Sequence, residues 1–147
     1  MTIFWDTNLF IYLWEKKSST REMTALVTDM ETRRHTLATS ALSLGEILVQ
    51  PARQGQAELM VRYVEAMQRL VLIPFDAEAA ICFANLRAAQ PSLRPPDAIQ
   101  LACAITRKCD LFLTNDNRLA HVTTPHAIKI QSLGDWFSEQ QKLPVAR

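Results

Sequence analysis

The amino-acid sequence predicts an α/β fold in which helices cover both faces of a parallel sheet. Short runs of bulky apolar residues alternate with longer segments whose apolar residues recur at helical spacing. Parallel strands need crossover connections, and helices usually supply them. The 147 residues are long enough for one domain that buries about two-thirds of its unfolded surface.

The first part of the chain predicts two strands and three helices. An apolar run at residues 3–5 is expected to be a buried strand, and apolar residues 9–14 are expected to form the first helix. Ser40 is a suitable N-cap for a third helix, which Pro51 ends or kinks. Between them we expect a polar segment at 16–20, a second helix at about 20–34 and a second strand at 36–39.

The second part of the chain continues the alternation. Asp76 is expected to cap a fifth helix that ends before Pro91, and Pro95 lies where the first turn of a sixth helix tolerates proline. The other predicted elements are a fourth helix at about 54–69, a clearly buried third strand at 70–75, a fourth strand at 111–114, a weak fifth strand at 128–130 and a short closing helix at 132–140.

Composition narrows the class of protein. Apolar residues make up 48% of the chain and charged residues 21%, which is typical of a soluble globular protein. No apolar run approaches the roughly 20 residues that span a bilayer, and no basic region precedes the first apolar run. We therefore expect no membrane partner and a cytoplasmic location. The net charge of +1 does not decide for or against nucleic acid, and Cys82, Cys103 and Cys109 are expected to be reduced, mostly buried thiols.

Four acidic residues stand in settings that suggest a shared site. Asp6, Asp97 and Asp116 each lie at or near a predicted junction between a strand and a helix. In a parallel sheet such junctions share one edge, which is the edge where ligands bind. Glu46 lies within a mostly apolar segment of the third helix, where a buried carboxylate is costly unless it is paired or binds a metal.

Each acid also has an ordinary explanation. Asp6 and Asp116 are suitable helix caps, and Asp97 would interact favourably with the dipole of its helix, by about 0.3–1 kcal/mol. Glu46 suits an exposed position on an amphipathic helix. The site therefore depends on the four acids occurring together.

At these residues the sequence resembles the PIN-domain ribonucleases, and among them the VapC-type toxins of bacterial toxin–antitoxin pairs. The family opens with an apolar strand and Asp-Thr-Asn, as at residues 6–8, and has a helix from Ser to a Glu six residues later, as at 40–46 with Ser43 between. An Asp-Ala-x-x-Ala helix corresponds to residues 97–102, with one residue of difference in the spacing of the last Ala. The strand followed by Thr-Asn-Asp corresponds to residues 111–116, and Leu119 stands where the family often has Phe.

The resemblance implies a fold and a reaction. The fold is a single PIN-like nuclease domain over residues 1–147, a three-layer α/β/α sandwich whose central parallel sheet has about five strands. The reaction is endonucleolytic hydrolysis of RNA with Mg²⁺ or Mn²⁺, and the carboxylate oxygens suit these ions better than zinc. Asp6 and Asp97 are the first choice as metal ligands, completed by Glu46 and Asp116 directly or through water. The side chains expected to orient the acids by hydrogen bonds are those of Asn8, Ser40, Thr114 and Asn115.

The resemblance also implies partners. These are an RNA substrate, a homodimer and a cognate antitoxin, whose C-terminal segment covers the acidic cleft and places an Arg near the metal site. The first two helices carry Phe10, Tyr12, Trp14, Met23 and Met30. Either some of these form a groove for a partner helix, or all of them belong to the core.

Other functions fit less well. Zinc binding by Cys103, Cys109, His121 and His126 lacks the usual close-paired spacing. Phosphotransfer of the haloacid-dehalogenase kind needs an Asp at position 8, which is Asn, and a receiver-like domain needs paired N-terminal acids and a lysine at the end of a strand. A housekeeping PIN-domain RNA-processing nuclease and a catalytically silent PIN-like module that binds RNA or protein remain as alternatives.

Overall fold

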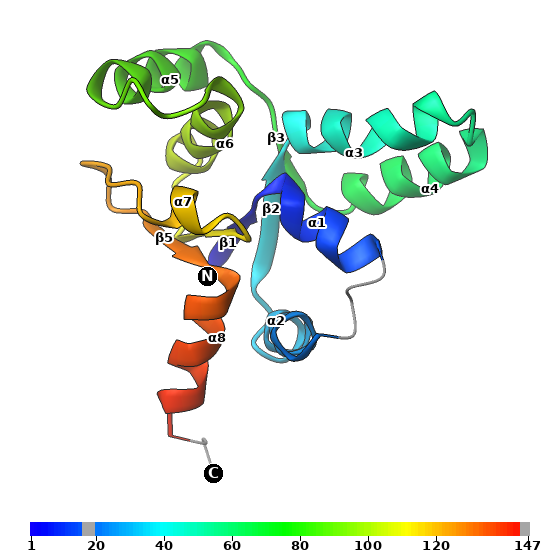
Figure 1. Ribbon diagram of the computed structural model, residues 1–147, viewed down its shortest axis with the longest axis horizontal. Helices are drawn as coiled ribbons and strands as arrows, with labels where there is room; N and C mark the ends of the chain where they lie inside the picture. Colours follow the sequence, from blue (N-terminus) through cyan, green and yellow to red (C-terminus); the bar gives the residue numbers. More distant parts are fainter. Residues whose placement is uncertain (16–19, 145–147) are drawn as a thin grey trace.

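A five-stranded sheet lies at the centre of the computed structural model, which describes residues 1–15 and 20–144 (Figure 1). Every neighbouring pair of strands is parallel, and the order is β3-β2-β1-β4-β5, so the first strand occupies the middle. The predicted α/β fold with about five parallel strands is confirmed. The strands are β1 (Thr2–Trp5), β2 (Thr36–Ser40), β3 (Val71–Ile73), β4 (Leu111–Thr114) and β5 (Lys129–Ser132).

Helices form a layer on each face of the sheet. Along β1 the side chains alternate, so Phe4 packs into one core while Ile3 and Trp5 pack into the other. One core is covered by α5 (Ala77–Ala89), α6 (Pro95–Thr106) and α7 (Asn117–Ala120). The other core is covered by α1 (Thr7–Trp14), α2 (Arg21–Thr32), α3 (Ala41–Arg53), α4 (Ala57–Gln68) and α8 (Leu133–Lys142). Together with the sheet, the two helical layers make the predicted α/β/α sandwich.

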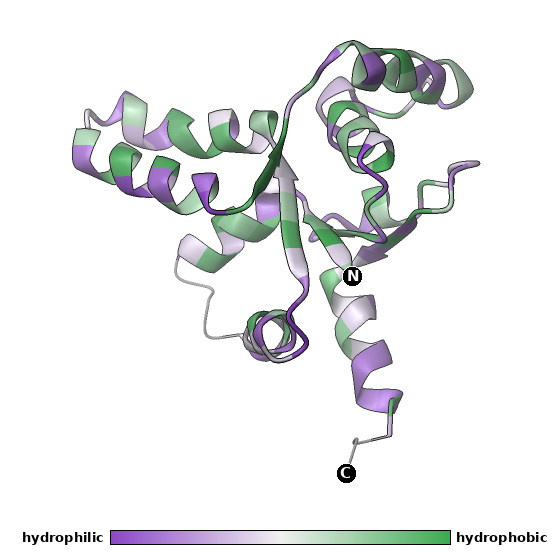
Figure 2. Ribbon diagram, turned by 180° about the vertical axis from the view of Figure 1, so that it is seen from behind, coloured by the Kyte–Doolittle hydropathy of each residue, from purple (hydrophilic) through white to green (hydrophobic). Residues whose placement is uncertain are grey.

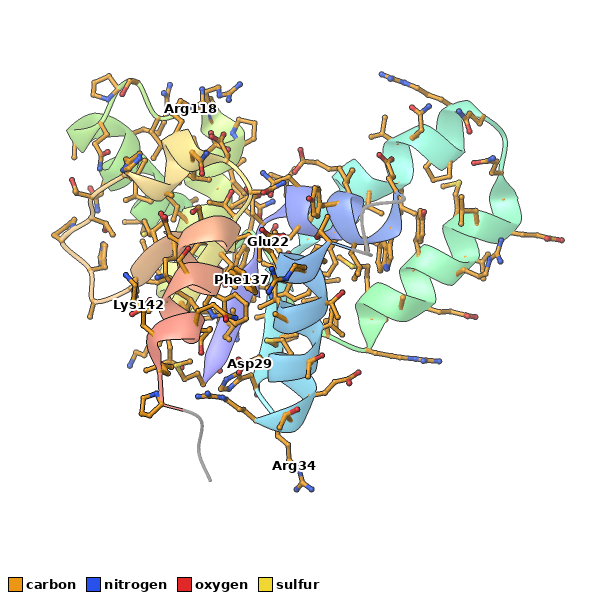
Figure 3. The ribbon with its side chains drawn as sticks, turned by 60° about the horizontal axis from the view of Figure 1, so that its bottom comes forward. Glu22, Asp29, Arg34, Arg118, Phe137 and Lys142 are labelled. Atoms are coloured by element: carbon orange, nitrogen blue, oxygen red, sulfur yellow. The ribbon has the colours of Figure 1, made fainter. Side chains whose placement is uncertain are left out.

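The helices show the expected mixture of surfaces. Hydrophilic and hydrophobic residues are interleaved along them, and α8 becomes more hydrophilic toward its C-terminal end (Figure 2). Helix α8, which carries Phe137, packs beside α2 (Figure 3). The Arg21 guanidinium carbon at the start of α2 lies 5.9 Å from the centre of the Phe137 ring. None of the helices in the described ranges is long and apolar enough to cross a membrane.

Two elements differ from the sequence prediction. The predicted buried strand at 70–75 is only Val71–Ile73 and lies at the edge of the sheet, with Val71 47% exposed. Pro74 lacks the N–H that a longer ladder would need, and prolines in sheets are confined to such edges. The short helix α7 was not predicted, although Asp116 had been interpreted as a possible cap and does cap this helix.

Most predicted helix starts are correct. Ser40 accepts a hydrogen bond from the Ser43 N–H at 3.2 Å, and Asp76 accepts one from the Ala79 N–H at 2.9 Å. Pro51 lies inside α3, which ends two residues later. The predicted polar segment at 16–20 falls mostly outside the described residues. The three cysteines are buried and free, as expected, and burial raises the pKa of Cys103 and Cys109 to about 11.

The carboxyl ends of β1 and β4 bring distant parts of the chain together. Trp5 pairs with Leu113, and the Asp6 N–H donates a hydrogen bond to the Leu113 carbonyl at 2.9 Å. Residue 6 therefore lies beside residues 114–116. Figure 3 shows Arg118, which follows β4, at the opposite end of the molecule from Arg34, which precedes β2.

Candidate active site

Asp6 is held where β1 gives way to α1. It is 6% exposed and caps the helix, with Oδ1 accepting a hydrogen bond from the Thr7 N–H at 2.8 Å. Its other oxygen, Oδ2, accepts a hydrogen bond from the Thr114 hydroxyl at 2.8 Å. Both interpretations of Asp6 are thus compatible, because one oxygen caps the helix while the second is fixed from the neighbouring strand.

Glu46 reaches the same region from α3. The residue is exposed, but its Oε1 accepts a hydrogen bond from the Thr7 hydroxyl at 2.8 Å. The Thr7 hydroxyl oxygen in turn accepts one from Gln100 Nε2 at 2.9 Å. The side chain of Gln100, 1% exposed, also donates to the Ser43 hydroxyl at 2.9 Å and accepts from the Ser40 hydroxyl at 2.5 Å. This network of neutral groups joins α1, α3 and α6.

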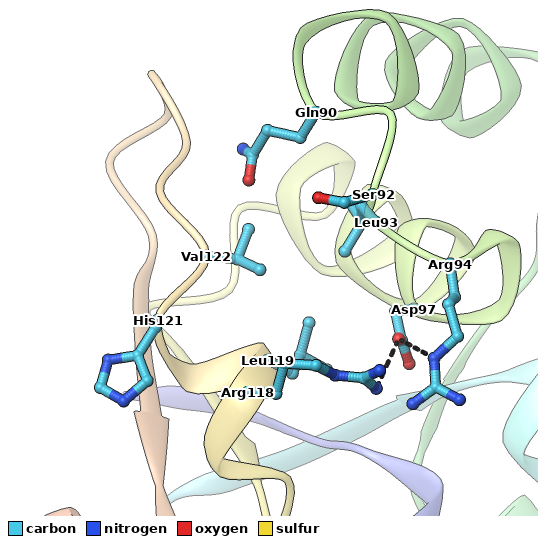
Figure 4. A pocket seen from close by; sticks show the side chains of 9 residues that line it. All are labelled: Gln90, Ser92, Leu93, Arg94, Asp97, Arg118, Leu119, His121 and Val122. Carbon is cyan, nitrogen blue, oxygen red and sulfur yellow. Dashed lines mark ion pairs between the residues drawn. The ribbon is translucent and has the colours of Figure 1, made fainter.

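Asp97 and Asp116 are held by arginines instead. Asp97 lies in the first turn of α6, with the guanidinium groups of Arg94 and Arg118 on either side of it (Figure 4). Its Oδ2 lies 3.6 Å from Arg94 Nε and 3.8 Å from Arg118 Nη2. Asp116 caps α7, and its Oδ2 accepts a hydrogen bond from Arg118 at 2.9 Å, with Arg94 at 3.8 Å. Both arginine side chains are more than half exposed, so these ion pairs remain in contact with solvent.

The four acids line one cavity of 320 Å³ at the carboxyl edge of the sheet. We call it the acid pocket and define it by Asp6, Glu46, Asp97 and Asp116. The carboxyl edge of the parallel sheet is thus the place where the acids meet, as the sequence predicted. Other residues that line the acid pocket include Thr7, Asn8, Arg94 and Gln100.

The acids influence each other's protonation. Burial raises the pKa of Asp6 to about 6, against the hydrogen bonds from Thr114 and Thr7, and the charges of Asp97 and Glu46 raise it further. Burial also raises the pKa of Asp97, against the opposing charge of Arg94. These mutual effects indicate that the carboxylates share one electrostatic environment.

The donor chemistry of the acid pocket fits a hard divalent cation. Carboxylate and hydroxyl oxygens are the ligands that Mg²⁺ and Mn²⁺ prefer. Within residues 1–15 and 20–144, however, no three acidic, histidine or cysteine side chains are arranged to hold one ion. Two of the acids are turned toward arginines, and Glu46 is turned toward Thr7. A bound ion therefore requires side-chain rearrangement around Asp97 and Asp116.

The four residues expected to orient the acids lie at different distances from them. Thr114 contacts Asp6 directly, and Asn8 accepts a hydrogen bond from the Asn115 N–H at 3.0 Å while its own amide lies 3.4 Å from the Thr114 hydroxyl. Asn115 contributes only this backbone N–H to these contacts, and the residue is exposed. Among the described residues Ser40 makes no hydrogen bond to an acid: its hydroxyl caps α3 and donates to Gln100, which connects to Glu46 through Thr7.

Sequence reasoning missed several residues of the site. The side chain of Gln100 had a signal, since it is the one amide in the apolar stretch from Ala98 to Ile105. Thr7 lies inside the Asp-Thr-Asn motif but had no assigned role. Arg94 and Arg118 had no signal, because charged residues near helix ends are ordinary surface residues.

Comparison with known protein families decides the classification. The profile of the PIN domain matches residues 3–124. The chain belongs to the PIN domain family. The PIN domain match contains all four acids, and it confirms the resemblance found in the sequence. No functionally curated protein matches the chain.

Several solved structures share this fold, among them chains of two DNA-bound VapBC complexes and of a toxin–antitoxin complex. A chain of VapBC2 from Rickettsia felis, bound to a DNA fragment from its promoter, is 18% identical with a TM-score of 0.71, covering 90% of this chain and 98% of that one. A chain of DNA-bound VapBC from Salmonella typhimurium is 22% identical with a TM-score of 0.69, covering 90% of this chain and 98% of that one. A chain of a toxin–antitoxin complex from Klebsiella pneumoniae is 25% identical with a TM-score of 0.62, covering 87% of this chain and 100% of that one. These likenesses concern the fold.

Proposed function

We propose that residues 1–147 form a single PIN-like nuclease domain that cleaves RNA endonucleolytically with Mg²⁺ or Mn²⁺, as the toxin of a VapBC-type pair. One observation carries the proposal: four acids from separate segments line the same pocket. Membership of the PIN domain family and the fold shared with VapBC chains support it.

In this proposal Asp6 and Asp97 hold the metal, with Glu46 and Asp116 completing its coordination directly or through water. A bound divalent ion supplies an acidified water and neutralises charge on the phosphate and the leaving oxygen. The protein keeps the ligands in place: Thr114 fixes one Asp6 oxygen, and the Gln100 network fixes Glu46 through Thr7. No nucleophilic side chain of the protein is needed.

The proposed partner is an antitoxin whose C-terminal segment covers the acid pocket and places an Arg near the metal, and a helix of the same partner would pack against the first two helices. Phe10, Met23 and Met30 are buried, so the core explanation holds for these three. Trp14 is half-buried and stacks on Tyr63 with ring centres 4.8 Å apart. It also lines an almost entirely apolar hollow of 230 Å³ between α1, α2 and α4, which suits the apolar face of a helix.

Nuclease activity is the direct test of the proposed function. Purified wild type should cleave single-stranded RNA with Mg²⁺ or Mn²⁺ and leave 5′-phosphate ends, whereas EDTA or Asp6→Asn should abolish cleavage. Activity that survives complete removal of metal would exclude the metal mechanism. A folded wild type that binds RNA but never cleaves it would identify the silent module.

Growth separates a toxin from a housekeeping nuclease. Induced expression of wild type without a partner should arrest growth, while equal expression of folded Asp6→Asn should not. If wild type cleaves RNA but is as harmless as Asp6→Asn, the toxin assignment fails and the housekeeping nuclease remains. Size measurement of the purified protein tests the proposed homodimer.

A further inference from the structure

A second hollow opens beside the acid pocket. It has a volume of 240 Å³ and lies between the segment that leads into α6 and the segment that contains α7 (Figure 4). We call it the side pocket. Arg94 and Asp97 line both hollows, so they form the boundary between the side pocket and the acid pocket. A polymeric substrate held at the acids can therefore extend into the side pocket.

Two guanidinium groups with free donors lie at this place: Arg94 forms part of the boundary, and Arg118 lines the side pocket next to it. The side chains of Arg94 and Arg118 are 60% and 58% exposed. Only the contact of Arg118 with Asp116, at 2.9 Å, has hydrogen-bond length, since Arg94 lies 3.6 Å and 3.8 Å from the acids. Most of the N–H groups of the two arginines are thus available. Two adjacent guanidiniums with free N–H groups suit phosphate oxygens, which they bind in paired hydrogen bonds.

The floor of the side pocket is apolar and its rim is polar. Leu93 and Leu119 are buried there, and Val122 lies beside them. The Ser92 hydroxyl and the His121 ring also line the hollow, and neither has a hydrogen-bond partner among the residues that the structure describes. An apolar surface with a few unpaired polar groups is the kind of site that takes an unstacked nucleobase.

Size and shape favour one nucleotide of a single strand. The volume of 240 Å³ is below the roughly 300–1,000 Å³ of pockets that enclose drug-sized ligands. A paired base stays within its helix and would not enter such a hollow, whereas a base in a single strand can be turned outward.

We propose that the side pocket binds the nucleotide adjoining the scissile phosphate of single-stranded RNA, with Arg94 and Arg118 binding the phosphate at the boundary and the base lying on Leu93, Leu119 and Val122. This inference rests on the proposed nuclease function and adds the part of the substrate that the acids do not contact. The arginines bind phosphate irrespective of sequence, and the side pocket discriminates among bases.

The phosphate contact is tested by the salt dependence of RNA binding. Full-length Asp6→Asn protein, which is not expected to cleave, is titrated in Mg²⁺ with fluorescein-labelled homopolymers of A, C, G and U, and anisotropy is followed at several salt concentrations. Adding Arg94→Ala or Arg118→Ala should weaken binding on the order of tenfold. Each should also reduce the slope of log K against log salt by roughly 0.7, the value for one phosphate contact on a single strand.

A matched control comes from the same helix. Arg107 is exposed at the far end of α6, so Arg107→Ala removes the same charge away from both pockets and should leave the slope unchanged. The base contact is tested by Ser92→Phe, which fills the hollow from its exposed rim. Ser92→Phe should weaken binding of the preferred homopolymer about tenfold without changing the slope.

The outcomes separate this inference from the nuclease proposal. It is overturned if the Asp6→Asn protein binds no homopolymer, or if Arg94→Ala and Arg118→Ala behave like Arg107→Ala. If Ser92→Phe binds the homopolymers as well as its parent protein does, the base does not occupy the side pocket. If wild type cleaves RNA in those cases, the nuclease proposal stands without the side pocket. If wild type does not cleave RNA while the arginine effects persist, the nuclease proposal alone fails.

Discussion

The two sides of the acid pocket hold their carboxylates by different means. On one side, neutral groups fix Asp6 and Glu46: two threonines donate to them, and the buried Gln100 amide supports the threonine at position 7. On the other side, Asp97 and Asp116 face arginines that are more than half exposed. Neutral donors fix the geometry of an acid without cancelling its charge, whereas exposed ion pairs cancel charge and can exchange partners.

We call Asp6 and Glu46 with their donors the neutral side and Asp97 and Asp116 with their arginines the arginine side, and we expect the two sides to have different roles. Burial raises the pKa of Asp6 although the neutral donors oppose the rise, so the ionised carboxylate is destabilised, and a bound cation would relieve this cost. A cation would compete with the arginines for Asp97 and Asp116, and a substrate phosphate would compete with these acids for the arginines. We therefore expect one side to be rigid and the other to rearrange when ligands bind.

The largest expected effect is on turnover, and it should be equal on both sides. Asp6→Asn and Asp97→Asn should each lower kcat for RNA cleavage by more than about 10³-fold, since a catalytic metal contributes several kcal/mol to the transition state. Circular dichroism should show that both variants remain folded. If only one variant loses activity, the two sides do not form one catalytic site.

The next effect is on the pH dependence of stability without metal, and it belongs to the neutral side. Burial raises the pKa of Asp6 from 3.8 to about 6, so the folded protein binds more protons than the unfolded chain between these values. The free energy of unfolding should therefore fall by about 3 kcal/mol as pH rises through this range. Urea unfolding in EDTA should show this fall in wild type and a smaller one in Asp6→Asn. Parallel curves for the two proteins would contradict the assignment of the effect to Asp6.

Metal should reverse this loss of stability. An ion that binds only the folded state at about 100 times its Kd adds about 2.7 kcal/mol. That gain corresponds to a rise in Tm of roughly 5–10 °C for a chain of this size. Thermal melts with Mn²⁺ and with EDTA should show the rise in wild type and little change in Asp97→Asn. A variant that gains as much as wild type would show that Asp97 does not bind the ion.

A smaller effect tests the rigidity of the neutral side. Gln100→Leu should lower kcat by about 10–100-fold, because Thr7 and Glu46 would no longer be held in place. It should also destabilise the fold by roughly 1–3 kcal/mol, because the buried hydroxyl groups would lose a hydrogen-bond partner. Gln68→Leu, at an exposed position of α4, is the control and should change stability by less than about 0.5 kcal/mol. Recovery of kcat in Gln100→Asn, or a loss of stability without a loss of kcat, would distinguish positioning from packing.

The sequence predicted the parts of the site that depend on local pattern. An apolar run followed by an acid specifies a strand end, and parallel pairing of β1 with β4 then places Asp6 beside residues 114–116. The Ser40 cap, the start of α6 and the acids could be found in the same way. Gln100 could also have been found, because a lone amide among apolar helix residues needs partners when buried.

The remaining features depend on contacts between distant segments. The short length of β3 follows from its place at the sheet edge, which its own apolar residues do not reveal. Arg94 precedes α6 and Arg118 lies in α7, and their pairing with the acids exists only because both segments meet at one edge of the sheet. Helix α7 has only four residues, too few for a periodic signal.

The smallest expected effect concerns the arginine side. Removing one arginine should lower the stability of the protein slightly and should raise its affinity for metal. Arg118→Ala should cost less than about 1 kcal/mol in EDTA, because exposed ion pairs contribute little. The same variant should bind Mn²⁺ a few-fold more tightly in calorimetry without RNA, since Asp97 and Asp116 no longer share their charge with a competing cation. Arg107→Ala removes equal charge at the far end of α6 and should leave the affinity unchanged. Weaker metal binding by Arg118→Ala would mean that the arginine positions the acids rather than competing for them, and the arginine side would then be as fixed as the neutral one.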